Sequence, residues 1–226
     1  MNLLIINGNP GLCSAYSDFA GFNELQVDTI PDNQILYNGR VWRNLYTNVK
    51  ETQFLFSREF LTGSVTMRGK TFSNIMIKYD ILKDEILTPG STGKILQLNK
   101  EMVDSFSLLF NNIKYQFVKI QGDSLSGPEG YCNILHRGIY SLYVKYVKKI
   151  GKLADEGKYD KFYQINKIYL FRNGVPYPVS SKNDLVKLLS GDKASIRNFI
   201  NKNNITISKD YPESFIPVLS YLETQR

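Results

Sequence analysis

Cys132 and His136 are the first residues whose types could do chemistry, because an imidazole can activate a neighbouring thiol as a nucleophile. They are four positions apart in the run YCNILHRG. In an extended strand such residues are separated by about 13 Å, which is too far for proton transfer. We therefore interpret them as a buried cysteine and a histidine beside a turn, and we assign no catalytic residue.

Metal chemistry finds little support in the sequence. His136 is the only histidine, and the two cysteines form no C-x-x-C motif, so we predict no metal site and no cofactor. Three carboxylates, Asp80, Asp84 and Glu85, cluster in KYDILKDEIL near an expected turn. They could form an acid/base pair on a sheet rim, but we interpret them as solvated turn charges.

The most basic part of the chain runs from Tyr140 to Lys167, where lysines are interleaved with tyrosines. This combination can bind single-stranded nucleic acid, but it is also typical of a solvated sheet face or a protected edge. Trp42, in GRVWRNLY, could stack on a sugar or a peptide, or it could belong to the core. The residues proposed for a ligand or partner surface are Trp42, Tyr143, Lys145, Lys148 and Lys149.

Composition indicates a folded chain with a large core. Of the 226 residues, 42% are hydrophobic and 22% charged, which is ordinary for a globular domain. The net charge of +7 favours an anionic partner, such as an anionic envelope component, over a cationic one. No run approaches the ~18 apolar residues of a membrane-spanning helix, and Cys13 and Cys132 allow one disulfide at most.

Five two-residue turn signals separate runs that favour strands, among them many of the 15 Tyr and 13 Phe residues. They are Asn38-Gly39, Arg68-Gly69, Asn111-Asn112, Arg137-Gly138 and Asn173-Gly174. The runs between them alternate with period two. In SFSLLF, for example, Phe106 and Leu108 point one way and Ser105 and Ser107 the other. The pattern predicts antiparallel hairpins.

The period changes to 3.6 after about Val179, which predicts three short helices. Ser181 is three residues before Asp184, as in a capping box, and begins the first helix. Ile196, Phe199 and Ile200 indicate a second. A third has Phe215, Val218, Leu219 and Leu222 as its apolar stripe, with Ser214 as the expected cap because Pro217 is tolerated only in a first turn.

The predicted fold class is therefore α+β: mainly an antiparallel β-meander, curled or formed into a half-barrel, followed by about three short C-terminal helices. We divide the chain into residues 1–18, a degenerate signal peptide or a first strand; residues 19–179, the antiparallel β domain; and residues 180–226, a helical segment packed on the sheet.

The first residues, MNLLIINGNPGLCSAYSD, allow several interpretations. LLIINGNPG resembles the first strand and phosphate loop of flavodoxin-like flavin-dependent reductases, but the hairpins that follow do not suit a parallel sheet. PGLCSA could instead be a signal-peptide cleavage region, although no Lys or Arg precedes it. The third interpretation is an ordinary first strand, which would leave the protein in the cytoplasm.

A broader resemblance extends from about Phe19 onward. It depends on YNGRVWRNLYTNVKETQFLFS, on the hairpins that follow, and on DLVKLLSGDKASIRNFINKNNITI. In these parts the chain resembles uncharacterised bacterial cell-envelope proteins that combine a β-meander with a Lys- and Asn-rich helical tail. The resemblance implies export to the periplasm or the cell surface and no assigned activity.

The leading functional hypothesis is therefore a non-enzymatic, exported β-rich protein that binds a partner or provides structural support. The alternatives are a flavodoxin-like reductase and a basic module that binds single-stranded nucleic acid.

Overall fold

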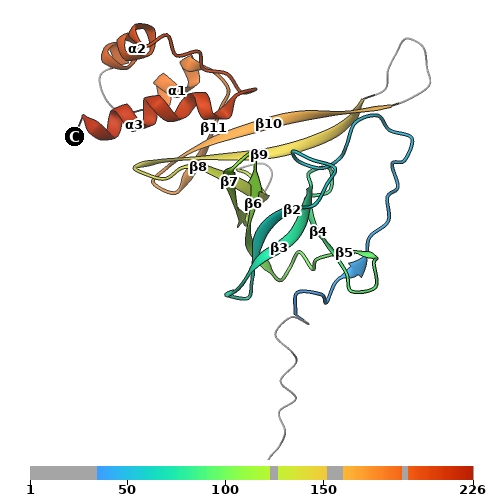
Figure 1. The fold of residues 1–226 in the computed structure, drawn as a ribbon. Coiled ribbons are helices and arrows are strands. Elements are labelled where there is room, and N and C mark those ends of the chain that lie inside the picture. The colour runs from blue at the N-terminus through green and yellow to red at the C-terminus, as the bar shows by residue number, and fades with distance from the viewer. Residues whose placement is uncertain (1–34, 123–126, 152–159, 190–192, 226) are drawn as a thin grey trace, which may run out of the picture.

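The computed structural model describes residues 35–122, 127–151, 160–189 and 193–225 (Figure 1). The predicted signal peptide or first strand, residues 1–18, lies outside the described residues. The strands are β1 (Arg40–Val41), β2 (Leu61–Met67), β3 (Lys70–Asp80), β4 (Glu85–Pro89), β5 (Ile95–Gln97), β6 (Val103–Phe110), β7 (Ile113–Ile120), β8 (Gly130–His136), β9 (Tyr140–Gly151), β10 (Lys161–Arg172) and β11 (Val175–Val179). The helices are α1 (Lys182–Leu188), α2 (Lys193–Lys202), the 3-10 turn η1 (Pro212–Phe215) and α3 (Ile216–Thr224).

All the named strands belong to one sheet, in the order β1-β5-β4-β3-β2-β6-β7-β8-β9-β10-β11, and each strand is antiparallel to its neighbours. The sheet is open, with β1 at one edge and β11 at the other. Most neighbours are consecutive hairpins, because short turns join adjacent runs. The exceptions are β2 with β6 and β1 with β5. The prediction of a mainly antiparallel sheet followed by short helices is confirmed.

Three of the predicted two-residue turns have the expected backbone. Both residues of Arg68-Gly69, Asn111-Asn112 and Asn173-Gly174 have positive φ, between 48° and 78°. This is the geometry of a type I′ hairpin turn. Arg137-Gly138 also joins two paired strands, β8 and β9, but neither residue has a positive φ; a register shift between Ile134 and His136 accommodates the longer connection.

The predicted hairpin at Asn38-Gly39 is wrong. The residues after this pair form β1, which pairs with β5 and not with the preceding run. The glycine is required by a close approach instead: a Cβ on Gly39 would lie 2.1 Å from the carbonyl oxygen of Gln97. A turn signal and a close contact select the same residue type, so the sequence alone could not distinguish them.

Aromatic rings fill the middle of the core. Phe106 and Phe117 stack with centroids 4.5 Å apart, and Tyr79 and Tyr131 meet Phe106 edge to face. These side chains come from β3, β6, β7 and β8, and Phe106 lies on the apolar face that period-two alternation predicted for SFSLLF. Edge-to-face and stacked rings add about 0.5–1.5 kcal/mol per pair to the gain from burial, so this cluster fixes how the central strands pack.

The helices gather on one side of β8, β9, β10 and β11 (Figure 1). Ser181 caps α1 as predicted, since its Oγ accepts the Asp184 N–H. The later start of the third helix is also confirmed, but the predicted cap is wrong: α3 begins at Ile216, while Ser214 lies in η1 and its Oγ accepts the Ser208 N–H. No helix in the described ranges is both long and apolar enough to cross a membrane.

An irregular segment, residues 50–56, connects distant strands; we call it the strap. Its Leu55 N–H donates to the carbonyl of Tyr79 on β3, and its Lys50 carbonyl accepts from Phe162 on β10. Directly beside it, the N–H of Lys148 on β9 donates to the carbonyl of Ile81. The strap therefore holds the end of β3 against the long β9–β10 hairpin.

Candidate functional site

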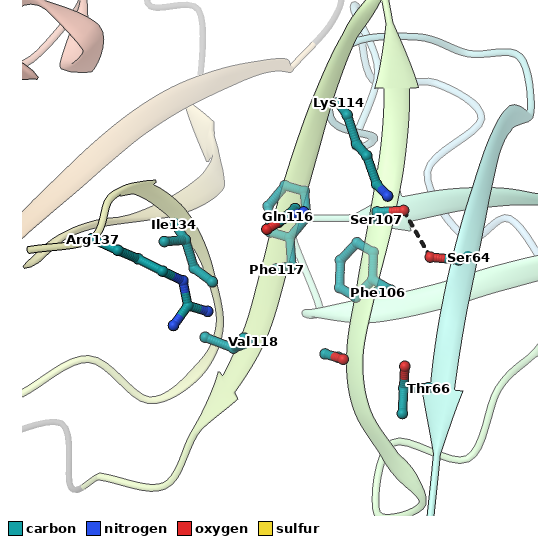
Figure 2. A pocket seen from close by; sticks show the side chains of 11 residues that line it. Ser64, Thr66, Phe106, Ser107, Lys114, Gln116, Phe117, Val118, Ile134 and Arg137 are labelled. Carbon is teal, nitrogen blue, oxygen red and sulfur yellow. Dashed lines mark hydrogen bonds between the residues drawn. The ribbon is translucent and has the colours of Figure 1, made fainter. Parts of the chain in front are cut away.

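Two adjoining hollows lie on the face of the sheet opposite the aromatic core. The first has a volume of about 230 Å³ and the second about 220 Å³, and they share Ser64, Ser107 and Lys114. We call the two together the polar groove. Its side chains come mainly from β2, β6 and β7, and Figure 2 shows those of the first hollow. Together the lining residues are Thr62, Gly63, Ser64, Thr66, Ser73, Asn74, Ser105, Phe106, Ser107, Leu109, Lys114, Gln116, Phe117, Val118, Ile134 and Arg137.

Strand register explains why hydroxyl groups meet in this groove. Ser64 on β2 lies directly opposite Ser107 on β6, which in turn lies opposite Gln116 on β7. Opposed residues in an antiparallel sheet point to the same face, so the three form one polar row. The Oγ atoms of Ser64 and Ser107 are 2.8 Å apart and hydrogen-bonded (Figure 2).

Two β-bulges flank this row. Asn74 is the extra residue between the pairs Gly63↔Ile75 and Ser64↔Ser73, and its φ is 56°. Asp104 is the extra residue in the pairing of β2 with β6. A bulge bends its strand, increases the local twist and redirects side chains. The two bulges therefore shape the part of the sheet where the groove lies.

The groove contains two cations and no carboxylate. Lys114 lines both hollows, and Arg137, from the connection after β8, lines the first. Across the part of the chain that the structure describes, neither side chain has an ion-pair partner. No Asp or Glu belongs to the lining of either hollow. The positive charge at this face is therefore not neutralised locally.

Asp84 is the centre of a second, buried polar cluster. Its carboxylate accepts hydrogen bonds from Lys145 Nζ at 2.5 Å, Lys100 Nζ at 2.7 Å and Tyr79 Oη at 2.5 Å. Asp84 is the last residue of the turn between β3 and β4, and its φ is 60°. Its Oδ2 lies so near Gly130 that a Cβ there would be 1.9 Å away. Only glycine fits, and the close approach lets one carboxylate join β3, β8 and β9.

Electrostatics keep the Asp84 cluster ionised. Burial alone would raise the pKa of Asp84, but the charge of Lys145 and the hydrogen bonds from Lys100, Lys145 and Tyr79 outweigh it and hold that pKa below its ordinary value. Burial, together with the neighbouring Asp84 charge, raises the pKa of Tyr79 well above its ordinary value. Both groups thus stay in one protonation state at neutral pH, as suits a structural ion cluster.

Asp80 is a different kind of buried carboxylate. It is 0% exposed, and it accepts hydrogen bonds from Gln53 Nε2 in the strap at 2.7 Å and from the backbone N–H groups of Leu82 and Lys83. Burial outweighs these bonds and raises its pKa to about 6. The interpretation of Asp80 and Asp84 as solvated turn charges is therefore wrong, because both carboxylates point into the protein.

The structure does not bring the residues of the predicted ligand or partner surface together. Trp42 is half-buried and packs its ring on Phe54, with centroids 5.8 Å apart. Its buried Nε1 has no hydrogen-bond partner among the described residues. Lys148 also meets the strap, where its Nζ donates to the carbonyls of Thr52 and Phe54. Trp42 and Lys148 thus support the strap.

The other three predicted residues lie along β9. Tyr143 meets the ring of Phe171 edge to face, with centroids 4.8 Å apart, and Lys145 is paired with Asp84. Lys149 is exposed. Lys148 is on the opposite face of β9, because adjacent strand residues alternate. Two of the three predicted lysines are thus occupied by internal partners.

Cys132 and His136 do not form a catalytic pair. Cys132 is buried with a free thiol. Burial, partly offset by Lys145, raises its pKa to about 12, so it stays a poor nucleophile. His136 Nε2 instead lies 3.0 Å from Glu223 Oε1 and connects β8 to α3. This agrees with the interpretation drawn from their spacing.

Metal binding and flavin chemistry each require a particular arrangement of residues or strands. In the described ranges no three His, Cys, Asp or Glu side chains come together as a metal site would require. A flavodoxin-like reductase needs a parallel sheet with helices on both faces, whereas the strands here are antiparallel and the helices follow them all.

Sequence reasoning missed the polar groove. The signal was present as alternating hydroxyls in the runs of β2 and β6, and Ser105 and Ser107 were assigned to the face opposite Phe106. Which strand lies beside β2 could not be known from the runs themselves. Ser64 and Ser107 are 43 residues apart, and only the β2–β6 pairing makes them neighbours.

Comparisons with known proteins found no similarity: no family model, no curated protein and no solved structure matches the chain.

Proposed function

We propose that this protein is a non-enzymatic binding protein and that its ligand lies in the polar groove on β2, β6 and β7. The observation that supports this most directly is the lining itself. Hydroxyls, an amide and two cations without an ion pair among the described residues face a hollow whose floor is formed by the paired strands β2, β6 and β7. A few well-placed polar groups on a rigid support are typical of a site that selects a ligand.

The lining also favours binding over catalysis. A serine nucleophile needs a base within hydrogen-bond reach, and neither hollow contains a His, Asp or Glu. The hydrogen-bond partner of Ser64 is another hydroxyl, that of Ser107. Such a pair presents donors and acceptors to a ligand but provides no proton acceptor of suitable pKa.

Export to the periplasm or the cell surface is part of the same proposal. It is supported by the net charge of +7, which suits anionic surroundings. Mass spectrometry of the native protein tests it. A mature chain that starts at or near Tyr16 supports export by cleavage, and an intact Met1 contradicts that route.

The groove is tested with the double variant Ser64→Ala/Ser107→Ala. Removing both members of a hydrogen-bonded pair leaves no unsatisfied hydroxyl, so we expect the fold to survive. The wild-type protein is titrated with soluble oligosaccharides, neutral and acidic, while backbone amide chemical shifts are followed by NMR. We expect saturable shifts on β2, β6 and β7.

The double variant should weaken this binding at least tenfold. Ser220→Ala, which removes an exposed hydroxyl on α3, is the matched control and should bind like the wild type. Absence of saturable shifts for every saccharide, or shifts confined to other strands, contradicts the proposed groove.

A further inference from the structure

The charges of the polar groove restrict the class of ligand. Lys114 and Arg137 enter the first hollow from different sides (Figure 2). Some cations among the described residues have carboxylate partners: Lys100 and Lys145 pair with Asp84, and Arg40 pairs with Glu85. In the groove, Lys114 and Arg137 line the same hollow as several hydroxyls, and the lining includes no carboxylate.

The nearest carboxylate along the strand does not cancel this charge. Asp104 precedes the groove residue Ser105, but it is the bulged residue of β6. Its Oδ2 accepts the N–H of Gly69 in the β2–β3 turn, at 3.1 Å. The carboxylate of Asp104 therefore meets a turn and is not part of the lining of either hollow.

The uncharged lining suits a ligand rich in hydroxyl groups. Ser64, Ser105, Ser107 and Thr66 can each donate and accept, and Gln116 adds an amide. The backbone of these strands is largely hydrogen-bonded to neighbouring strands. The side chains are therefore the groups that can form hydrogen bonds with a ligand. Sugar hydroxyls have the same dual donor and acceptor character.

The aromatic lining argues against nucleic acid. Phe106 and Phe117 reach the groove, but they are 3% and 1% exposed, because their rings belong to the core on the other face. Single-stranded nucleic acid is bound mainly through bases stacked on exposed aromatic rings. The groove has no ring in a position to do this.

The length of the groove favours a chain over a single small anion. The second hollow continues from the first along β2 and β3, and Lys114 lies where the two meet. Arg137 is in the first hollow only. A ligand that reached Arg137 and filled both hollows would pass Lys114 midway, so charges repeated along a polymer would meet two cations.

We propose that the ligand of the polar groove is an acidic polysaccharide, whose carboxylates or sulfates bind Lys114 and Arg137 while its hydroxyls bind the serine row. This rests on the proposed binding function and names the ligand class for the same groove. Guanidinium and ammonium groups both form charge-assisted hydrogen bonds with such anions, and the guanidinium group of Arg can form bidentate ones.

The experiment measures affinity by calorimetry for four probes: oligogalacturonate, which has carboxylates; chondroitin sulfate oligosaccharides, which also have sulfates; a neutral cello-oligosaccharide; and oligo-dT. We expect either acidic saccharide to bind at least tenfold more tightly than the neutral one and than oligo-dT. The two acidic probes distinguish the source of the anion. Binding should weaken as salt is raised.

The variants Lys114→Met and Arg137→Met should each weaken acidic-saccharide binding about tenfold. Lys149→Met removes an exposed lysine outside the groove and is the matched control. All three side chains are exposed, so folding should be retained, and circular dichroism checks it. Equal effects of all three variants would indicate nonspecific attraction and overturn the inference.

The two proposals fail differently. If the neutral saccharide binds as tightly as the acidic ones and still depends on Ser64 and Ser107, the groove is a binding site but the acidic ligand class is wrong. If oligo-dT binds as tightly as the saccharides, the groove does not select sugars and the inference is overturned. If nothing binds, both proposals are wrong.

Discussion

The replacement Asp80→Asn should change how the stability of this protein depends on pH. Asp80 is fully buried, and its pKa is raised to about 6 from an ordinary value of 3.8. An asparagine can keep the main contacts. Its Oδ1 can accept from Leu82 and Lys83, and the Gln53 amide can turn so that its oxygen accepts from the new Nδ2.

The sign and size follow from proton linkage. Between pH 4 and 6 the folded protein holds a proton on Asp80 that the unfolded chain has lost, so the wild type loses stability as pH rises through this range. Below pH 4 both states are protonated, and above about pH 7 both are ionised. The interval from 3.8 to about 6 corresponds to about 3 kcal/mol.

The assay is urea unfolding of both proteins at pH values from 3.5 to 7.5. The free energy of unfolding of the wild type should fall by about 3 kcal/mol relative to Asp80→Asn over that range. Asp84 titrates in both proteins and cancels. Asp210→Asn, which removes an exposed carboxylate, should run parallel to the wild type. A constant difference between wild type and Asp80→Asn across the range would refute the reasoning.

Two further predictions concern the ion cluster and the first helix cap. Lys145→Met leaves Lys100 as the single ion-pair partner of the buried Asp84 among the described residues. The free energy of unfolding, measured in urea, should therefore fall by about 3 kcal/mol. The exposed control Lys149→Met should lose less than about 0.5 kcal/mol, and equal losses would disprove the structural role of the pair. Ser181→Ala removes the acceptor for the Asp184 N–H and should cost about 1 kcal/mol by the same assay; an unchanged free energy of unfolding would show that the cap contributes nothing.

Features set by near neighbours were predictable. The type I′ turn at Asn111-Asn112 depends on two residues that tolerate positive φ, and the cap at Ser181 depends on a residue three positions away. The buried face of β6 follows from alternation within eight residues. Some failures were also local. At Gly39 a turn and a close contact select the same residue type, and the Oγ of the expected cap, Ser214, accepts the backbone N–H of Ser208 instead.

The environment of a charged side chain was not predictable in the same way. Asp84 meets Lys145 across 61 positions and Lys100 across 16. Because these partners are distant in the sequence, the run KYDILKDEIL by itself indicates only a solvated turn. Lys145 and Lys148 were assigned to an outer surface for the same reason, since a lysine in an alternating strand gives no sign of the partner that it meets.

By itself, the sequence determined several hairpin turns, the apolar face of β6 and the capped start of α1. These features depend on interactions over a few residues, so the local spacing of residue types predicts them. The tertiary structure alone decided that β2 pairs with β6, that Asp80 and Asp84 point inward, and that Ser64, Ser107, Lys114 and Arg137 line one groove. The physical reason is that hydrogen-bonding groups on a strand accept any antiparallel neighbour, and only packing of the whole core selects which one.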